Sequence, residues 1–321
     1  MHASSTGLRA NASQPGPAGR LVLVAGGTGF IGSAVVRALA STRRVTVLAR
    51  DATRARKRFE AAELDVDIRQ GDVTNPDSLD HRLDGVDTVV QCVQFTGFPV
   101  EAPARRLTFM DVDAAGTLAL LDAARAQDVR KIVYLSGVGA DPHARQPWFR
   151  AKGIAEASVR SSGLAFAIVR PSWTYGPGDR SLNRFIAILK TVPGFFPQVG
   201  RGDQRLNPVF VGDVARVVSE AASGDILDGT TVEIGGLEVL TLDEVLRASM
   251  RAIGREKPIV HIPLAFALFG ARMLEALPGQ ILSADAVRFL TQSAVADLQV
   301  LRDRLPGFGP LGLDEALATY V

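Results

Sequence analysis

The chain has 321 residues, of which 47% are hydrophobic and 22% are charged. This is the balance of an ordinary globular protein with one large domain or a domain and a smaller lobe. The net charge is only +2 and the basic residues are scattered, which argues against a nucleic-acid-binding surface. Cys92 is the only cysteine, so no intramolecular disulfide can form and a reducing compartment is expected. The four histidines lack metal-ligand spacing, and no metal site is predicted.

Two stretches of the sequence, the polar N-terminal tail and a late apolar segment, bear on where the protein is located in the cell. Residues 1–20 are small and polar and lack the apolar core of a secretory signal, so we expect a disordered tail. A cytoplasmic protein is predicted, with an organelle matrix as the alternative because the tail contains arginines and serines but no acid. Residues 262–279 are strongly apolar but are broken by Pro263, Gly270, Arg272 and Glu275. They fall short of the roughly 20 apolar residues that span a bilayer. A buried or surface-docking helix is expected, which leaves peripheral membrane contact open.

From Arg20 onward, short apolar runs alternate with helical patterns. In chain order, strands are expected over 21–27, 44–50, 66–73, 87–95, 131–139 and 166–172, and helices over 31–41, 52–62, 75–85, 113–129 and 148–156. Apolar strands separated by helices indicate a parallel sheet that is covered on both faces. Right-handed crossovers make such a sheet doubly wound. The predicted fold is therefore α/β, with a doubly wound parallel sheet over residues 21–175.

After residue 175 the alternation loosens, and prolines and glycines become frequent. Two further strands are expected at 207–213 and 231–236, followed by helices. We predict a smaller, mainly helical C-terminal lobe over residues 176–321. Its segments 207–215 and 229–236 are expected to return to the main domain.

A glycine-rich turn, "VAGGTGFIG", lies between the first strand and the first helix. Gly26 can form the tight turn, Gly29 leaves a pyrophosphate free to approach the backbone, and Gly32 lets the helix pack closely on the strand. The N-terminus of the helix offers free N–H groups and a positive dipole end to phosphate. In this strand–turn–helix context the motif predicts a bound dinucleotide. The predicted cofactor-binding residues of the turn are Gly26, Thr28, Gly29, Phe30, Ile31 and Gly32.

The end of the second strand indicates which dinucleotide is bound. An acid at this position accepts hydrogen bonds from the ribose hydroxyl of NAD, whereas an arginine accommodates the 2′-phosphate of NADP. The strand ends on Ala49 and Arg50, which favours NADP(H) over NAD(H). Asp51 keeps NAD(H) open, because a shift of one or two residues would turn its carboxylate toward the ribose.

Together these motifs resemble the short-chain dehydrogenase/reductase superfamily in its extended and atypical branches. Within it, the chain is most similar to the group around the NAD(P)H-binding accessory subunit of respiratory complex I and its bacterial relatives. The stretches that carry the resemblance are "VAGGTGFIG", "GDVTN", "VDAAGTLALLDAA", "YLSGVGA" and "IVRPSWTYGPGD". The resemblance implies that Asp72 and Val73 lie beside the adenine and that Ser136 is the active-site serine. It also implies that Lys152 binds the nicotinamide ribose.

The chain departs from the family pattern at two positions. The family's Tyr-x-x-x-Lys is Trp148-x-x-x-Lys152 here, and Asp113 stands where extended members usually have asparagine. A tyrosine hydroxyl beside a lysine can protonate the alkoxide that hydride transfer creates, but an indole cannot. Losing such an acid typically lowers the rate by about 10²–10⁴-fold. Trp148 is therefore expected to wall the substrate pocket, and Tyr175, in the turn after the sixth strand, is a candidate replacement acid. The predicted catalytic residues are Ser136, Lys152 and Tyr175.

Three functions follow from this pattern. The first is a redox protein that binds NAD(P)(H) and acts on a small apolar or quinone-like molecule without the usual tyrosine. The second is a non-catalytic NADP(H)-binding structural, assembly or redox-sensing subunit. The third is a sugar-nucleotide epimerase or dehydratase, against which the missing tyrosine counts. The sequence predicts neither the substrate nor the oligomeric state.

Overall fold

The computed structural model describes residues 20–95, 101–275 and 292–321, with side chains left undescribed for 270–275. Its main domain is built on a seven-stranded sheet with the order β11-β6-β5-β4-β1-β2-β3. Every neighbouring pair in this sheet is parallel, as the apolar strands predicted. The strands are β1 (Leu21–Ala25), β2 (Arg44–Ala49), β3 (Asp67–Gln70), β4 (Val86–Gln91), β5 (Lys131–Leu135), β6 (Ala165–Pro171) and β11 (Thr230–Ile234).

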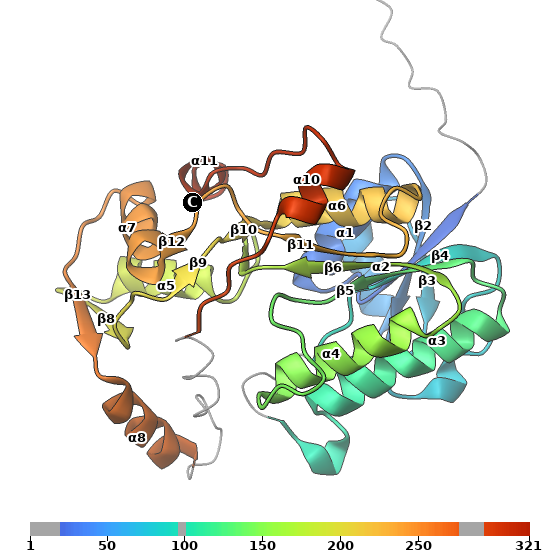
Figure 1. Ribbon diagram of the computed structural model, residues 1–321, viewed down its shortest axis with the longest axis horizontal. Helices are drawn as coiled ribbons and strands as arrows, with labels where there is room; N and C mark the ends of the chain where they lie inside the picture. Colours follow the sequence, from blue (N-terminus) through green and yellow to red (C-terminus); the bar gives the residue numbers. More distant parts are fainter. Residues whose placement is uncertain (1–19, 96–100, 276–291) are drawn as a thin grey trace, which may run out of the picture.

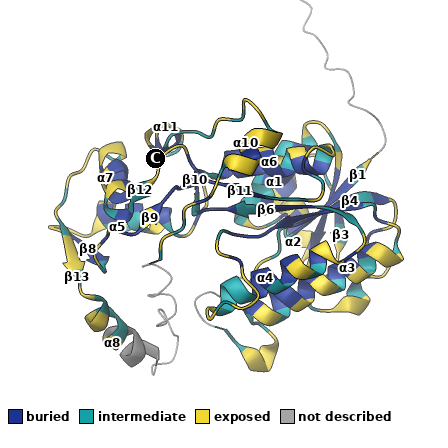
Figure 2. Ribbon diagram, in the orientation of Figure 1, coloured by how far each residue is buried: buried dark blue, intermediate teal, exposed yellow. Residues whose placement is uncertain are grey.

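Helices cover both faces of this sheet, which confirms the doubly wound α/β fold (Figure 1). One face is covered by α1 (Phe30–Ala40), α2 (Ala52–Glu60) and α6 (Val211–Ser223), and the other by α3 (Gly116–Ala126) and α4 (Pro147–Arg160). Each helix turns its apolar positions inward, as Val35, Val36 and Leu39 of α1 do, and leaves its polar positions in water. Figure 2 shows the result: buried strands between helices whose outer surfaces are exposed.

Two segments from beyond residue 175 pack on the main domain. Strand β11 pairs with β6 and forms an edge of the sheet. Helix α6 packs against α1 through Val214, Val217 and Val218, which belong to the same buried cluster as the apolar side chains of α1. The expected strand at 207–213 is largely wrong, because only Val209 and Phe210 of β10 are extended and α6 begins at Val211.

The C-terminal lobe has its own hydrophobic clusters around α5, α7 and α11. Helix α8 of this lobe exposes two aromatic side chains to solvent. The exposed fraction is 72% for Phe266 and 67% for Phe269. No helix in the described parts of the chain is long and apolar enough to cross a membrane. The remaining elements are α5 (Leu182–Thr191), α7 (Leu242–Ala252), α8 (Leu264–Glu275), α10 (Gln299–Arg304), α11 (Leu313–Ala318), β7 (Thr174–Tyr175), β8 (Phe196–Val199), β9 (Arg205–Leu206), β10 (Val209–Phe210), β12 (Leu240–Thr241) and β13 (Ile259–Ile262).

Two expected helices differ from the structure. The helix expected over 75–85 is only a 3₁₀ turn, η1 (Pro76–Leu79), because Asp80 leaves helical geometry with a ψ of 127° and His81 follows with a left-handed φ of 56°. The helix expected over 113–129 begins with a π-helical segment, η3 (Met110–Ala115), before α3. Most of the predicted tail, residues 1–19, and residues 276–279 of the apolar stretch lie outside the described residues.

Candidate active site

The glycine turn after β1 has no room for side chains at two of its glycines. Gly26 has a φ of 79°, and a Cβ there would lie 2.7 Å from the backbone of Cys92. A Cβ on Gly32 would lie 2.2 Å from the carbonyl oxygen of Gly26. A Cβ on Gly29 would meet only that same oxygen, at 3.2 Å, so the space beyond Gly29 is open. The turn therefore brings β1 and α1 into close contact and leaves one face of its backbone accessible.

The N-terminus of α1 suits a bound phosphate. Gly29 is the N-cap, no side chain caps the helix, and the first turn carries no acid. The first N–H groups of a helix have no partner within the helix, and its dipole favours an anion there. The turn and the helix end thus fit the pyrophosphate of a dinucleotide, with Thr28, Phe30 and Ile31 in the segment that would surround it.

At the end of β2 the carboxylate of Asp51 is already engaged. Asp51 is the N-cap of α2, and its Oδ1 accepts a hydrogen bond from the Arg54 N–H at 2.8 Å. The neighbouring Arg50 is exposed, and its guanidinium makes no hydrogen bond or ion pair with any residue that the structure describes. The charged group left available at the tip of the strand is therefore a cation.

The segment after β3 is held by its own side chains. Oδ1 of Asp72 accepts hydrogen bonds from the N–H of Thr74 at 2.9 Å and from its hydroxyl at 2.8 Å. Val73 is buried against Gly116, where a Cβ would lie 2.8 Å from Val73 Cγ2. Asp72 and Val73 thus form a fixed edge beside α3, and their place beside an adenine stays a prediction.

Lys152 lies on the inner face of α4 and is only 2% exposed. Its Nζ lies 3.2 Å from Oδ1 of Asp113 and donates a hydrogen bond to the Leu135 carbonyl oxygen, also at 3.2 Å. Burial lowers the pKa of Lys152, but Tyr134 and Asp113 together outweigh this and leave it above its usual value. Lys152 is therefore an ammonium ion that is paired inside the protein.

Asp113, its partner, is fully buried in the π-helical segment η3. Its other oxygen, Oδ2, accepts a hydrogen bond from the Phe95 N–H at 2.9 Å. Burial raises the pKa of Asp113, and the ammonium of Lys152 only partly opposes this. The second departure from the family pattern thus gives Lys152 an acidic partner in place of an amide.

Trp148 lies one turn before Lys152 and covers Gly137, the residue that follows Ser136. A Cβ on Gly137 would lie 2.7 Å from Cη2 of the indole. The Trp148 ring also makes an edge contact with Phe149, with centroids 4.7 Å apart, and packs against the buried cluster that contains Phe95 and Phe109. The indole therefore belongs to an apolar, largely aromatic wall directly beside the buried ion pair.

Ser136 does not point its hydroxyl at Lys152. The hydroxyl donates a hydrogen bond of 2.6 Å to Glu156, a buried carboxylate one turn further along α4. Glu156 in turn accepts two hydrogen bonds of 2.7 Å from Arg170 and one of 2.7 Å from Arg160. The sequence analysis missed Glu156, although its position four residues after Lys152 on the same helix face was a usable signal.

The arginines around Glu156 lead to a prediction about acid stability. Burial raises the pKa of Glu156, but Arg170 and Ser136 lower it more, so the net pKa lies below its usual value of 4.5. A carboxyl with a lowered folded pKa stabilises the protein above its unfolded pKa and loses this effect as the pH falls through the folded value. Glu156→Gln should lower the free energy of unfolding at pH 7 by about 1.5–3 kcal/mol. Urea unfolding should show this deficit shrinking below pH 4.5, and a constant deficit down to pH 3 would contradict the prediction.

Tyr175 packs in a different buried cluster from the residues around Lys152. It is fully buried in the cluster of the C-terminal lobe, and its ring centroid is 6.1 Å from that of Phe210. Burial is the largest cause of its raised pKa, and Tyr320 and Asp213 add to it, whereas Lys152 does not contribute. The structure does not bring Tyr175 together with the other predicted catalytic residues.

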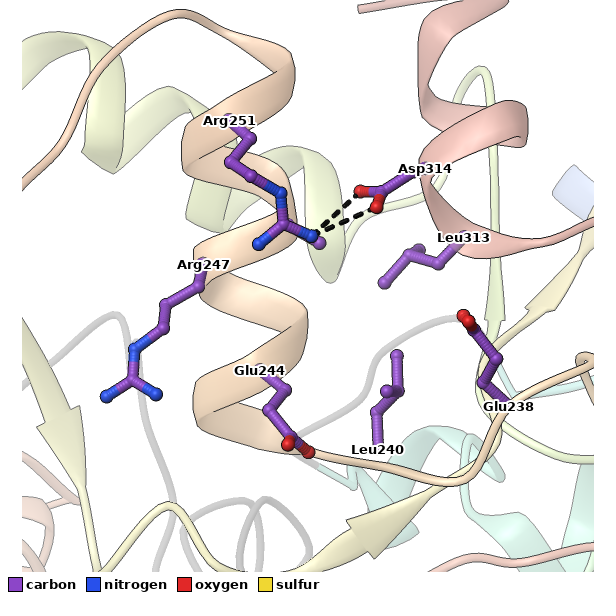
Figure 3. A pocket seen from close by; sticks show the side chains of 8 residues that line it. Glu238, Leu240, Glu244, Arg247, Arg251, Leu313 and Asp314 are labelled. Carbon is purple, nitrogen blue, oxygen red and sulfur yellow. Dashed lines mark hydrogen bonds and ion pairs between the residues drawn. The ribbon is translucent and has the colours of Figure 1, made fainter.

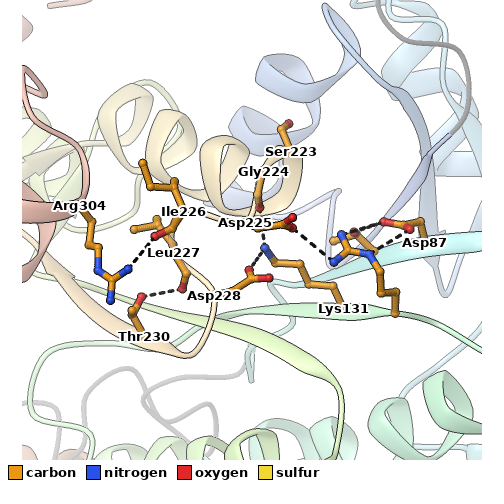
Figure 4. Close-up of polar contacts among 12 residues, drawn as sticks. Asp87, Lys131, Ser223, Gly224, Asp225, Ile226, Leu227, Asp228, Thr230 and Arg304 are labelled. Atoms are coloured by element: carbon orange, nitrogen blue, oxygen red, sulfur yellow. Dashed lines mark hydrogen bonds and ion pairs between the residues drawn. The ribbon is translucent and has the colours of Figure 1, made fainter.

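Two other polar regions lie away from the predicted site. Figure 3 shows a hollow between α7 and α11 that is lined by Glu238, Glu244, Arg251 and other residues. Figure 4 shows Lys131 at the start of β5, bonded to Asp228 and to the Gly224 carbonyl oxygen. The start of β5 is the opposite end of the sheet from the glycine turn, and ligands of such sheets bind beyond the carboxyl ends of the strands. Neither region contains a predicted site residue.

Comparison with known proteins agrees with this geometry. Residues 22–235 match the model of the NAD dependent epimerase/dehydratase family. The mitochondrial NADH-ubiquinone oxidoreductase 40 kDa subunit of Neurospora crassa is 26% identical over 84% of this chain and 70% of its own length. The NAD(P)H azoreductase of Xenophilus azovorans is 28% identical over 76% of this chain and 78% of its own length. The crystal structure of gox2253 superposes with a TM-score of 0.73 at 25% identity and covers 93% of this chain and 96% of that chain.

The resemblance predicted from the motifs is thereby confirmed, and with it the binding of a nicotinamide dinucleotide as the family's shared property. The glycine turn, Lys152 and the seven-stranded sheet except Leu21 lie within the matched residues 22–235. The chain belongs to the NAD dependent epimerase/dehydratase family, an extended branch of the short-chain dehydrogenase/reductases.

Proposed function

We propose that this protein binds NADP(H) in preference to NAD(H) and is a redox protein for a small apolar or quinone-like molecule. The observation that carries the proposal is the aromatic wall formed by Trp148 and its neighbours beside the buried Lys152. Apolar pockets with few polar groups select apolar ligands. The similarity to an azoreductase and to a subunit of NADH-ubiquinone oxidoreductase supports this class of chemistry.

Different residues bind the adenosine and nicotinamide ends of the cofactor. The glycine turn and the N-terminus of α1 hold the pyrophosphate, and Arg50 pairs with the 2′-phosphate while Asp51 stays in its cap. Lys152 donates hydrogen bonds at the nicotinamide end, where a bound nicotinamide would supply or accept a hydride. Trp148 excludes water from this end but cannot give a proton at neutral pH. Substrates whose reduction needs no strong acid from the protein therefore suit the site best.

A second candidate is a subunit that keeps NADP(H) bound without turning it over. Two features favour it. Lys152 is paired with Asp113 inside the protein, and position 148 holds an indole in place of the tyrosine that would donate a proton to the product. The similarity to the 40 kDa subunit points in the same direction. A sugar-nucleotide epimerase or dehydratase is disfavoured because that chemistry also requires the missing acid.

Turnover by Trp148 variants tests these candidates. The wild type should bind NADPH and oxidise it slowly with quinones. Trp148→Tyr places a phenol one turn from Lys152 and should raise the reduction of reactive carbonyls by up to about 10²-fold. Trp148→Phe should change neither binding nor rate, because it supplies no acid. NADPH absorbance and calorimetric titration measure the two quantities.

Gly29→Val is the matched negative control, because its side chain would occupy the open space at the turn while the protein stays folded. Binding without turnover on every quinone and carbonyl tried would favour the non-catalytic subunit. A fast wild type that loses its activity in Trp148→Phe would contradict a purely lining role for the indole.

A further inference from the structure

Beneath α4, polar side chains gather in a place where the fold would accept apolar ones. Gln91, Asp113, Thr117, Tyr134 and Lys152 are each at most 2% exposed. Gln91 donates a hydrogen bond to the Thr117 hydroxyl at 3.1 Å, which donates to the Asp113 carbonyl oxygen at 2.6 Å. Asp113 then pairs with Lys152. This connected group, which we call the buried polar cluster, lies at the carboxyl ends of β4 and β5, where the nicotinamide end of the cofactor is expected.

Tyr134, on β5, is the member of the buried polar cluster that lies beside Lys152 on the sheet. It lies opposite Gln91 in the register of β4 and β5, and its ring centroid is 5.3 Å from Lys152 Nζ. Its hydroxyl is fully buried and has no hydrogen-bond partner among the described residues. An unpartnered buried hydroxyl destabilises a protein, and phenylalanine would fill the same space without that cost. What distinguishes Tyr134 from the other buried tyrosines is that Lys152 Nζ lies over its ring, where its hydroxyl can act on the ammonium ion and a phenylalanine could not.

Of the three tyrosines in the chain, Tyr134 is the one whose ionisation Lys152 affects. Burial raises the pKa of Tyr134 to about 12, with Lys152 opposing this, so the phenol is neutral at physiological pH. The oxygen dipole of a neutral hydroxyl close to an ammonium ion stabilises the charged form of that ion. The other titratable groups that act on Lys152 or Tyr134 are Asp113 from η3, Cys92 after β4 and Glu156 from α4.

We propose that Tyr134 is the phenol partner of Lys152 in this chain, a positioning residue that holds Nζ charged and directed at the cofactor site from the strand beneath the helix. The phenol that relatives place one turn earlier on the helix is thus supplied from β5. The proposal rests on the proposed function, because it assumes that Lys152 contacts the cofactor. It goes beyond the proposed function because it assigns a role to Tyr134, which touches neither substrate nor cofactor and acts only through Lys152.

The test compares Tyr134→Phe with Tyr320→Phe, a matched control whose hydroxyl is also buried and without a partner but lies in the C-terminal lobe. Calorimetric titration from pH 6 to pH 10 should show Tyr134→Phe binding NADPH several-fold more weakly, since the hydroxyl dipole beside the Lys152 ammonium ion is lost. The decline of binding at high pH should also begin at a lower pH in this variant. Tyr320→Phe should match the wild type, and Tyr134→Phe should melt no lower than the wild type.

A second measurement works without the cofactor. The chain has five lysines, so the Cε resonance of Lys152 can be identified in ¹³C-labelled protein by comparison with Lys152→Met. This resonance should move in Tyr134→Phe and stay in place in Tyr320→Phe. An unmoved resonance, or a binding profile equal to that of the wild type at every pH, would overturn the role of Tyr134. A wild type that binds no NADPH would instead reject the proposed function, and the resonance would still decide whether the two side chains interact.

Discussion

Replacing Lys152 with methionine is expected to lower the free energy of unfolding by about 3–5 kcal/mol. The methionine side chain fills a similar volume, so packing changes little. The loss arises because Asp113 is fully buried and would keep only the Phe95 N–H at 2.9 Å as a hydrogen-bond donor to its carboxylate. An unpaired buried charge is costly, whereas the intact pair is close to neutral in its net effect. Urea unfolding measures the change, and an unchanged m-value would show that the native state remains compact.

The second substitution of the pair is the decisive control. Adding Asp113→Asn to Lys152→Met removes the buried charge and should recover most of the lost stability. Lys57→Met, on the exposed face of α2, should have almost no effect. If Lys152→Met and the double variant were equally unstable, the ion pair would not be the source of the loss. A double-mutant cycle gives the coupling energy directly.

Arg50→Ala is expected to weaken the binding of NADPH by roughly tenfold or more while changing the binding of NADH little. A charged hydrogen bond to a phosphate contributes on the order of 1.5–3 kcal/mol, and 1.4 kcal/mol corresponds to a tenfold change in affinity. NADH has no 2′-phosphate, so its affinity for the protein should change little in this variant. The Asp51 carboxylate should not compensate, because it accepts the Arg54 N–H in the cap of α2. Parallel titrations with the two cofactors measure both affinities.

Arg56→Ala provides the comparison, because Arg56 lies on the exposed face of α2, the basic helix that follows Arg50. It should affect NADPH only weakly, through long-range charge that added salt screens. Equal losses for both cofactors in Arg50→Ala would remove the argument for the 2′-phosphate. A wild type that prefers NADH would mean that Asp51 leaves its cap to bind the ribose.

The sheet and the glycine turn could be predicted because their causes are local. The central strands are rich in buried apolar residues, and Gly29 and Gly32 both face the Gly26 carbonyl oxygen within a single turn. The helix expected over 75–85 is wrong because its residues have helical composition but the chain leaves helical geometry at Asp80 and turns at His81, which composition does not reveal. Local patterns thus predicted the architecture but not where a turn replaces a helix.

The interior of the site could not be predicted, because its contacts join distant parts of the chain. Lys152 meets Asp113, and Ser136 bonds to Glu156, only after η3, α4 and β5 have packed together. The sequence indicated that Trp148 lacks a titratable proton, but not that the indole would lie on Gly137. Residue types could therefore be assigned a chemistry, whereas the choice of partners depended on tertiary packing.

The π-helical segment η3 makes the buried ion pair depend on the length of the chain. A π turn contains one residue more than an α turn, and Asp113 lies inside it. Deleting one alanine after Asp113 would let an ordinary α-helix form, and everything before the deletion would rotate by about 100° around the helix axis. The carboxylate would then leave Lys152, although no charged residue had been altered. A single-codon deletion here should therefore be as harmful as losing the aspartate itself.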